Sequence, residues 1–204
     1  MSDYTVTDVQ TLRKIYPEPK GVAVDKQLAA LDQPCRNFIA HAPFLVMGTD
    51  GDVSPKGDNP GFVKIVDDKT IVIPDRKGNN RMDSLQNILG NPNVGILFMI
   101  PGVHETLRVS GRAEICVDPE IVEPLAVNGK VPASAIVVHI EEVYLHCAKA
   151  LARARIWNQE AHVAKGIIPP AGRIYADQVG ADPTSLEKTY DEIISADLAD
   201  EGHT

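Results

Sequence analysis

Apolar residues in this chain occur mostly in short runs bounded by glycine, proline, asparagine or aspartate, a pattern that predicts β-strands. Six such runs are present, at residues 43–49, 53–66, 69–74, 94–100, 106–116 and 133–147. The turn signals Asp50-Gly51-Asp52 and Asp67-Asp68 separate the first three runs, so we expect an antiparallel meander over residues 43–74. Gly57, Pro60 and Gly61 interrupt its second strand, which indicates a bulge or a close approach of the backbone to a ligand.

The fifth run gives the clearest alternation. Leu107 and Val109 fall on one face of this segment, while Arg108 and Ser110 fall on the other. Such a period of two residues is typical of a strand with one buried face.

Helical patterns lie mainly at the two ends of the chain. Residues 7–16 predict a helix capped by Thr7 or Asp8, and residues 25–41 carry an apolar stripe in which Pro34 either interrupts the helix or begins a second one. Further helical segments are expected at 118–127 and 184–198, and residues 148–157 either extend the preceding strand or form a helix.

Several hairpin-connected strands with few helices predict a mainly β (α+β) fold, an antiparallel barrel of about six strands with flanking helices. The 204 residues fit a single domain. We divide it into N-terminal helices (1–42), the barrel (43–157) and a C-terminal acidic extension (158–204).

The net charge of −8 is concentrated at the C-terminal end, because residues 174–204 hold eight acidic residues and one lysine. The basic residues near 76–81 are not numerous enough to form a nucleic-acid-binding surface. The three cysteines lack metal-ligand spacing and predict reduced structural thiols. With neither a leader-like segment nor a long apolar run, we expect a soluble cytoplasmic protein with no metal and no membrane partner.

The segment from Pro74 to Pro101 is the best candidate for a binding site. It places cations, amides and a hydroxyl between a strand and a short helix, a combination that favours an anion such as phosphate. These side chains could instead simply solvate a loop. They are Arg76, Lys77, Asn79, Asn80, Arg81, Ser84 and Asn87.

A second candidate is the interrupted strand, where Ser54, Pro55 and Lys56 could be a bulged turn or part of a ligand site. Asp58, next to them, could pair with Lys56 or with Arg76. Asn87, His41, His139 and His146 are interpreted as structural residues, and no catalytic residue can be assigned.

Five stretches from residue 42 to residue 113, together with His146–Trp157 (HCAKALARARIW), resemble the pyridoxamine 5'-phosphate oxidase-related family of FMN-binding split β-barrel proteins. The five are APFLVMGT (42–49), SPKGDNPGFV (54–63), PDRKGNNRMDSLQN (74–87), NPNVGILF (91–98) and ETLRVSGRA (105–113).

The resemblance implies a homodimer that binds FMN at its interface and exchanges electrons with small-molecule donors and acceptors. By position, it implies that the phosphate and ribityl groups are bound by Arg76, Lys77, Asn80, Arg81 and Ser84. It implies that Ser54, Pro55 and Lys56 line the isoalloxazine and ribityl groups, and that the site is approached from the partner subunit by Lys149, Arg153 and Trp157.

Two departures limit this resemblance. Asp83 and Ser84 stand where the oxidase has an Arg-Lys pair, and residues 153–157 only loosely match its substrate motif. The resemblance therefore implies an FMN-dependent oxidoreductase of unknown substrate and does not extend to pyridoxamine phosphate oxidation. Alternatives on the same fold are a non-catalytic flavin, deazaflavin or haem carrier, with His41 or His146 as haem ligand.

Overall fold

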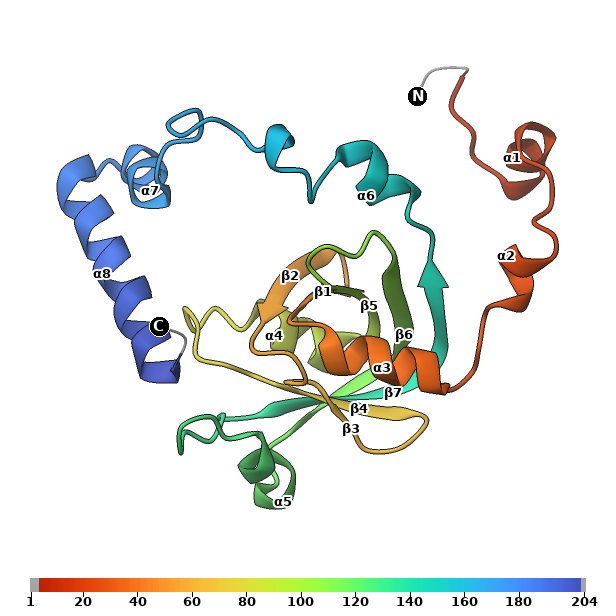
Figure 1. Cartoon of the computed structure of the whole chain (residues 1–204), viewed down its shortest axis with the longest axis horizontal. Coiled ribbons are helices and arrows are strands. Elements are labelled where there is room, and N and C mark those ends of the chain that lie inside the picture. The colour runs from red at the N-terminus through yellow and green to blue at the C-terminus, as the bar shows by residue number, and fades with distance from the viewer. Residues whose placement is uncertain (1–3, 203–204) are drawn as a thin grey trace.

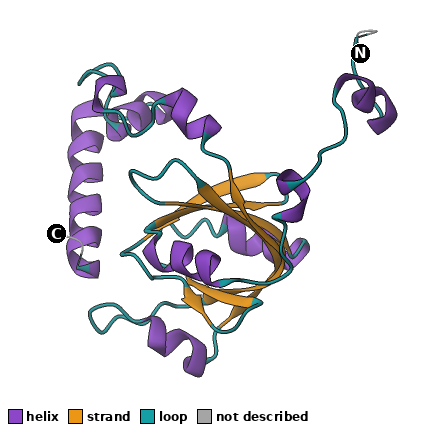
Figure 2. Ribbon diagram, turned by 45° about the vertical axis from the view of Figure 1, so that its right-hand side comes forward, coloured by secondary structure: helices purple, strands orange, loops and turns teal. Residues whose placement is uncertain are grey.

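A seven-stranded antiparallel sheet forms the centre of the protein, as seen in a computed structural model that describes residues 4–202. The sheet curls around its own core (Figure 2), and its strand order is β2-β1-β5-β6-β7-β4-β3. The prediction of a mainly β antiparallel split barrel with flanking helices is confirmed. The strands are β1 (Phe44–Thr49), β2 (Asp52–Gly57), β3 (Lys64–Ile65), β4 (Thr70–Pro74), β5 (Asn93–Met99), β6 (Thr106–Cys116) and β7 (Ala135–His146).

The predicted three-strand meander is wrong in one respect. β1 and β2 do form a hairpin, and β3 pairs with β4, but β2 and β3 lie at opposite edges of the sheet. The expected single strand over 53–66 is broken because Pro60 has no N–H to donate to a ladder and Gly61 takes a positive φ of 83°. The chain crosses between the edges here, and Phe62 and Val63 enter the core on the way.

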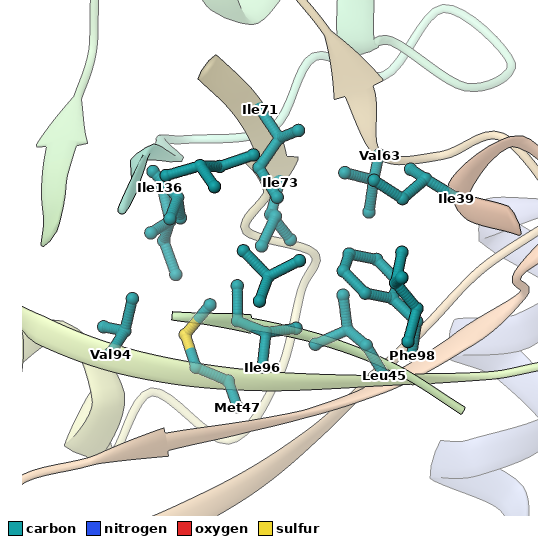
Figure 3. Packing of buried hydrophobic residues seen from close by; sticks show 14 of the residues in the cluster. Ile39, Leu45, Met47, Val63, Ile71, Ile73, Val94, Ile96, Phe98 and Ile136 are labelled. Carbon is teal, nitrogen blue, oxygen red and sulfur yellow. The ribbon is translucent and has the colours of Figure 1, made fainter. Parts of the chain in front are cut away.

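The core lies inside the curled sheet. Figure 3 shows Leu45, Ile96 and Phe98, from β1 and β5, together with Ile73 and Ile136, from β4 and β7. Phe98, Leu45 and Ile73 are completely buried. Burial of such side chains is the main stabilising term of a domain of this size.

The predicted alternation of β6 is confirmed, because Leu107 and Val109 are buried whereas Arg108 is exposed. A register shift at Ser110/Gly111 bends the strand against β7. A Cβ at Gly111 would collide with the carbonyl oxygen of His139, so only glycine fits this close approach.

The N-terminal helices only partly follow the predicted pattern. The Asp8 side chain accepts from the Thr11 N–H and caps the first helix, as expected. The stripe over 25–41, however, becomes helical only at Gln33, with Pro34 in the first turn, and Leu28 instead bridges to Val143 in β7. These helices are α1 (Val9–Ile15), α2 (Val22–Asp25) and α3 (Gln33–His41).

Of the remaining helices, some connect strands of the barrel and the others come after its last strand. Residues 148–157 form a helix rather than an extension of β7, and the expected helices near 118–127 and 184–198 are present. They are α4 (Asp83–Gly90), α5 (Pro119–Val122), the 3-10 turn η1 (Glu123–Leu125), α6 (Lys149–Ala154), the 3-10 turn η2 (Gln159–Ala161), α7 (Ala171–Val179) and α8 (Pro183–Glu201).

We call residues 148–202, which hold α6, α7 and α8, the C-terminal arm. It runs around the outside of the barrel, and the end of α8 returns toward the loop after β4 (Figure 1). α7 and α8 pack on each other, and Tyr175 meets Tyr190 edge to face with ring centroids 5.5 Å apart. Within residues 4–202, no helix is both long and apolar enough to cross a membrane.

Candidate functional site

A cavity of about 770 Å³ lies where the ends of β2 and β4 approach each other. The two strands are not neighbours in the sheet, so side chains rather than a backbone ladder bridge this seam. Eight of the predicted site residues line the cavity: Ser54, Pro55, Lys56, Arg76, Lys77, Asn80, Arg81 and Ser84.

The loop between β4 and α4 forms one wall of the cavity. Asn80 and Met82 both have a φ of 59°, a left-handed conformation that is uncommon outside glycine. Met82 is the N-cap of α4 and provides no side-chain cap, while Asp83, Ser84 and Leu85 of the first turn line the cavity. A helix start of this kind presents N–H groups and a positive dipole end to an anion.

Arg76 is held in place by two partners. Its Nε donates to Asp58 Oδ2 at 2.6 Å, and its Nη1 donates to the backbone oxygen of Leu125 at 2.9 Å. The Asp58 side chain is 2% exposed and that of Arg76 is 19% exposed. Of the two partners considered for Asp58, the structure therefore selects Arg76. This buried pair ties the β4–α4 loop to the end of β2 and shapes the cavity.

The opposite wall comes from β2, whose side chains alternate in exposure. Ser54 and Lys56 point to the half-buried face, whereas Pro55 lies on the exposed one. Lys56 Nζ lies 4.0 Å from Asp75 Oδ1, a second link across the seam. Lys56 thus brings a partly buried cation to the cavity from the strand side.

Two further cations have carboxylate partners that raise their pKa values. The side-chain hydrogen bond from Lys77 to Asp197, with Nζ 2.7 Å from Oδ1, raises the pKa of Lys77 above its ordinary value. The hydrogen bond from Arg81 Nε to Asp83 Oδ2 raises the pKa of Arg81 in the same way. Both side chains are therefore protonated at neutral pH.

Sequence reasoning missed Lys130 and the carboxylates of α8. Lys130, in the turn before β7, lines the cavity and pairs with Asp200, which lines it too, as does Glu201. The hydrogen bond from Lys130 lowers the pKa of Asp200. The Asn128-Gly129 turn could have indicated that Lys130 lies at a loop tip, but no local signal indicates which loops it meets.

The remaining three predicted residues do not lie on the cavity wall. Lys149 and Arg153 are on α6, and Trp157 Nε1 donates to the backbone oxygen of Val103 at 2.8 Å. This bond anchors the start of the C-terminal arm to the turn between β5 and β6. Their predicted contact with cofactor across a dimer interface stays a prediction.

The structure gives partners to most of the residues that we interpreted as structural. Asn87 Nδ2 donates to Thr49 Oγ1 at 3.2 Å, His41 Nδ1 lies 2.8 Å from the Asn37 carbonyl, and His139 pairs with Glu114. His146 Nδ1 is buried without a hydrogen-bond partner in the described part of the chain.

Cysteine and acidic side chains are the candidates for nucleophilic and metal-binding chemistry. Burial is the main cause that raises the pKa of the Cys35 thiol to about 12, so it is unreactive. Across residues 4–202, no group of three His, Cys, Asp or Glu side chains is arranged to hold a metal ion.

Comparison with known proteins gives one family match. The family model described as pyridoxamine 5'-phosphate oxidase matches residues 31–147, which is more than half of the chain. The matched region holds all seven strands of the sheet and every cavity-lining residue apart from those on α8. No curated protein matches this chain.

Several solved structures match part of this chain at low sequence identity. HupZ from Group A Streptococcus is 20% identical, with a TM-score of 0.46, and the match covers 56% of this chain and 93% of that protein. A putative pyridoxamine 5'-phosphate oxidase from Lactobacillus delbrueckii is 19% identical, with a TM-score of 0.45, covering 58% and 98%. An FMN-binding protein from Syntrophomonas wolfei is 11% identical, with a TM-score of 0.42, covering 68% and 96%.

Proposed function

This chain belongs to the pyridoxamine 5'-phosphate oxidase family, and on that premise we propose that it is a flavoprotein that binds FMN in the seam cavity. We further propose that it acts as an FMN-dependent oxidoreductase on a small-molecule donor and acceptor. The observation that carries the proposal is the convergence of Lys56, Arg81 and the uncapped start of α4 on one cavity of about 770 Å³. That volume lies within the range of known small-molecule sites.

The donor set fits the chemistry of FMN. The phosphate carries about two negative charges near neutral pH, and the first turn of α4 offers backbone N–H groups with the Ser84 hydroxyl beside them. Arg81 adds an exposed guanidinium, and Lys56 adds a cation from the other wall. Phe62, Leu85, Val127 and Val131 supply apolar lining for a flat ring.

When bound, FMN supplies the redox chemistry itself, since its ring accepts and donates electrons. The residues of this chain bind and orient. Arg76 keeps the β4–α4 loop against the end of β2, and the left-handed Asn80 and Met82 set the course of that loop along the cavity. Ser84, which lines the cavity, would hold a phosphate oxygen. A cation such as Lys56 near the ring would stabilise negative charge developing on it.

We also propose that the functional unit is a homodimer in which Lys149, Arg153 and Trp157 of one subunit complete the site of the other. These residues stand on or next to α6, which has no buried residue in the single chain. The Trp157 bond to Val103 fixes where this segment leaves the barrel. Native mass spectrometry tests this directly, with a dimer carrying two FMN molecules as the expected species.

Titration with FMN, monitored through the quenching of flavin fluorescence, tests the binding site. The Lys56→Ala/Arg81→Ala double variant is expected to bind FMN at least about tenfold more weakly, because each lost cation contributes a charge-assisted contact to phosphate. Arg108→Ala/Arg112→Ala removes two exposed cations of β6 that do not line the cavity, and is the matched control. Equal losses in both variants, or a wild-type protein that takes up no FMN, would contradict the proposal.

Turnover is measured separately from binding. The FMN-loaded protein is expected to pass electrons from a reduced nicotinamide to an artificial acceptor, with free FMN at the same concentration as control. Binding without any turnover over that background would restrict the function to a flavin carrier.

A further inference from the structure

The last turn of α8 is attached to the rim of the cavity by three polar contacts. Lys77 Nζ donates to Asp197 Oδ1 at 2.7 Å, and Asn128 Nδ2 donates to the backbone oxygen of Glu201 at 3.2 Å. The third contact is the pair between Lys130 and Asp200. Figure 1 shows the C-terminal end of α8 returning to the barrel at this place.

Charge makes this attachment more than a packing detail. Lys77 and Lys130 line the cavity, and each is paired with a carboxylate of α8. Asp200 and Glu201 line the same cavity. A phosphate that enters the cavity would be attracted to the two lysines and repelled by the Asp200 and Glu201 carboxylates. The lysines therefore cannot pair fully with α8 and with a phosphate at the same time.

The hold of α8 on the rim is weak. No residue of α8 is buried, and the paired side chains remain between 35% and 64% exposed. Ion pairs with this much exposure contribute little and are screened by salt. The connection from Arg155 to Pro170 is exposed along most of its length, so the α7–α8 pair can leave the rim as a unit.

We propose that the last turn of α8 is an internal competitor of the anionic ligand, occupying Lys77 and Lys130 until a phosphate group displaces it. This inference rests on the proposed FMN site for the identity of the ligand. It predicts that ligand binding releases α8 and that weakening the α8 contact tightens ligand binding.

Full-length variants separate docking from charge. Asp197→Asn/Asp200→Asn removes both carboxylate partners, whereas Asp177→Asn/Asp191→Asn removes the same number of charges from α7 and α8 at positions away from the cavity. Gly202→Ala changes no charge. Gly202 has a φ of 79°, and a Cβ there would collide with the Asn128 side chain, so this variant breaks the Asn128 hydrogen bond to Glu201 and removes one of the three contacts of α8 with the rim.

The first readout is the Kd for FMN. We expect Asp197→Asn/Asp200→Asn to bind about five- to tenfold more tightly and Gly202→Ala about two- to fivefold more tightly, with the control within about twofold of wild type. Unchanged or weaker binding by both test variants would overturn the inference, as it would make α8 a bystander or a supporting wall of the site.

The second readout is hydrogen exchange of the α8 amides in the wild-type protein. FMN and inorganic phosphate are expected to speed exchange in residues 195–201, whereas riboflavin, which has the same ring without the phosphate, leaves it unchanged. Release by riboflavin to the same extent, or FMN binding with no change in exchange, would contradict competition by an anion. If FMN does not bind at all, the proposed function fails, and the inorganic phosphate arm still tests the competition.

Discussion

The barrel and the C-terminal arm are stabilised in different ways. Every fully buried large side chain of the described chain belongs to the barrel strands or to α3, and examples are Phe98, Ile73 and Ile39. In the arm, the buried positions are Gly172 and Ala176 of α7. The barrel is therefore stabilised mainly by the hydrophobic effect, whereas the arm is stabilised by one helix pair, by surface ion pairs and by single hydrogen bonds such as that of Trp157.

This difference matters because residues of both regions line the cavity. β2 and the β4–α4 loop supply fixed walls, whereas α8 supplies carboxylates that can leave. A site built this way keeps its geometry when the arm moves. The experiments below test the contrast, from the largest expected effect to the smallest.

Phe98→Ala is expected to reduce the free energy of unfolding by about 3–5 kcal/mol, because it removes a completely buried ring from the barrel core. Leu198→Ala, its counterpart on α8, removes a side chain that is 43% exposed and is expected to cost less than about 0.5 kcal/mol. Urea denaturation of both variants checks this. Similar losses would mean that the arm is part of the same cooperative unit.

Arg76→Ala is expected to reduce the free energy of unfolding by about 2–3 kcal/mol, because the buried Asp58 carboxylate loses its guanidinium. The loss should be smaller than for a fully buried pair, because the Arg76 side chain is 19% exposed. Lys77→Ala, one residue along, breaks an exposed pair with α8 and should leave the unfolding midpoint within error. Thermal unfolding of the two variants is the measurement, and equal midpoints would contradict the distinction between a structural and a replaceable cation.

Gly172→Ala should disturb the arm without disturbing the barrel. A Cβ at this position would lie 2.5 Å from the Cα of Glu187, so α7 and α8 must separate, at a local cost of about 1–3 kcal/mol. We expect faster hydrogen exchange throughout α7 and α8 and an unfolding midpoint of the barrel within about 2 °C of wild type. A large fall in that midpoint would show that the arm supports the barrel.

The smallest expected effect is that of pH on the docking of α8. The lowered pKa of Asp200 stabilises the docked arm above the ordinary carboxyl range, and this contribution is lost as pH falls through the lowered value. The raised pKa of Lys77 stabilises it below the ordinary lysine range, with loss as pH rises through the raised value. Exchange in α8, corrected for its intrinsic rate, should therefore be flat between about pH 5 and pH 9 and should rise with salt. A midpoint near pH 6–7 would instead indicate a histidine.

The parts of the fold that were predicted correctly are those with local causes. The Asp50-Gly51-Asp52 turn specifies the β1–β2 hairpin, the two-residue period specifies the buried face of β6, and Asp8 specifies the start of α1. The loop of residues 76–84 was also recognisable, since cations and amides cluster next to a predicted helix start.

What could not be predicted depends on contacts between distant segments. A break at Pro60-Gly61 is visible in the sequence. The pairing of β4 with β7 rather than with β2, however, depends on the burial of β4 against the core, which no local signal specifies. The choice of Arg76 by Asp58 and the meeting of Lys130 with Asp200 likewise follow from tertiary packing. Sequence reasoning therefore found most of the cations that line the cavity and missed Lys130 and the carboxylates of α8.

The crossing of the chain at residues 58–63 also has a consequence for the order of folding. The β1–β2 hairpin closes over a few residues, whereas the pairing of β4 with β7 joins Ile73 to Ile136. Contacts between such distant residues are slow to form because a long loop must close first. Since the cavity needs both β2 and the end of β4 in place, a chain that has formed only its first hairpin cannot bind the ligand. We expect refolding followed by flavin fluorescence to report the last event on the pathway, the closing of the seam.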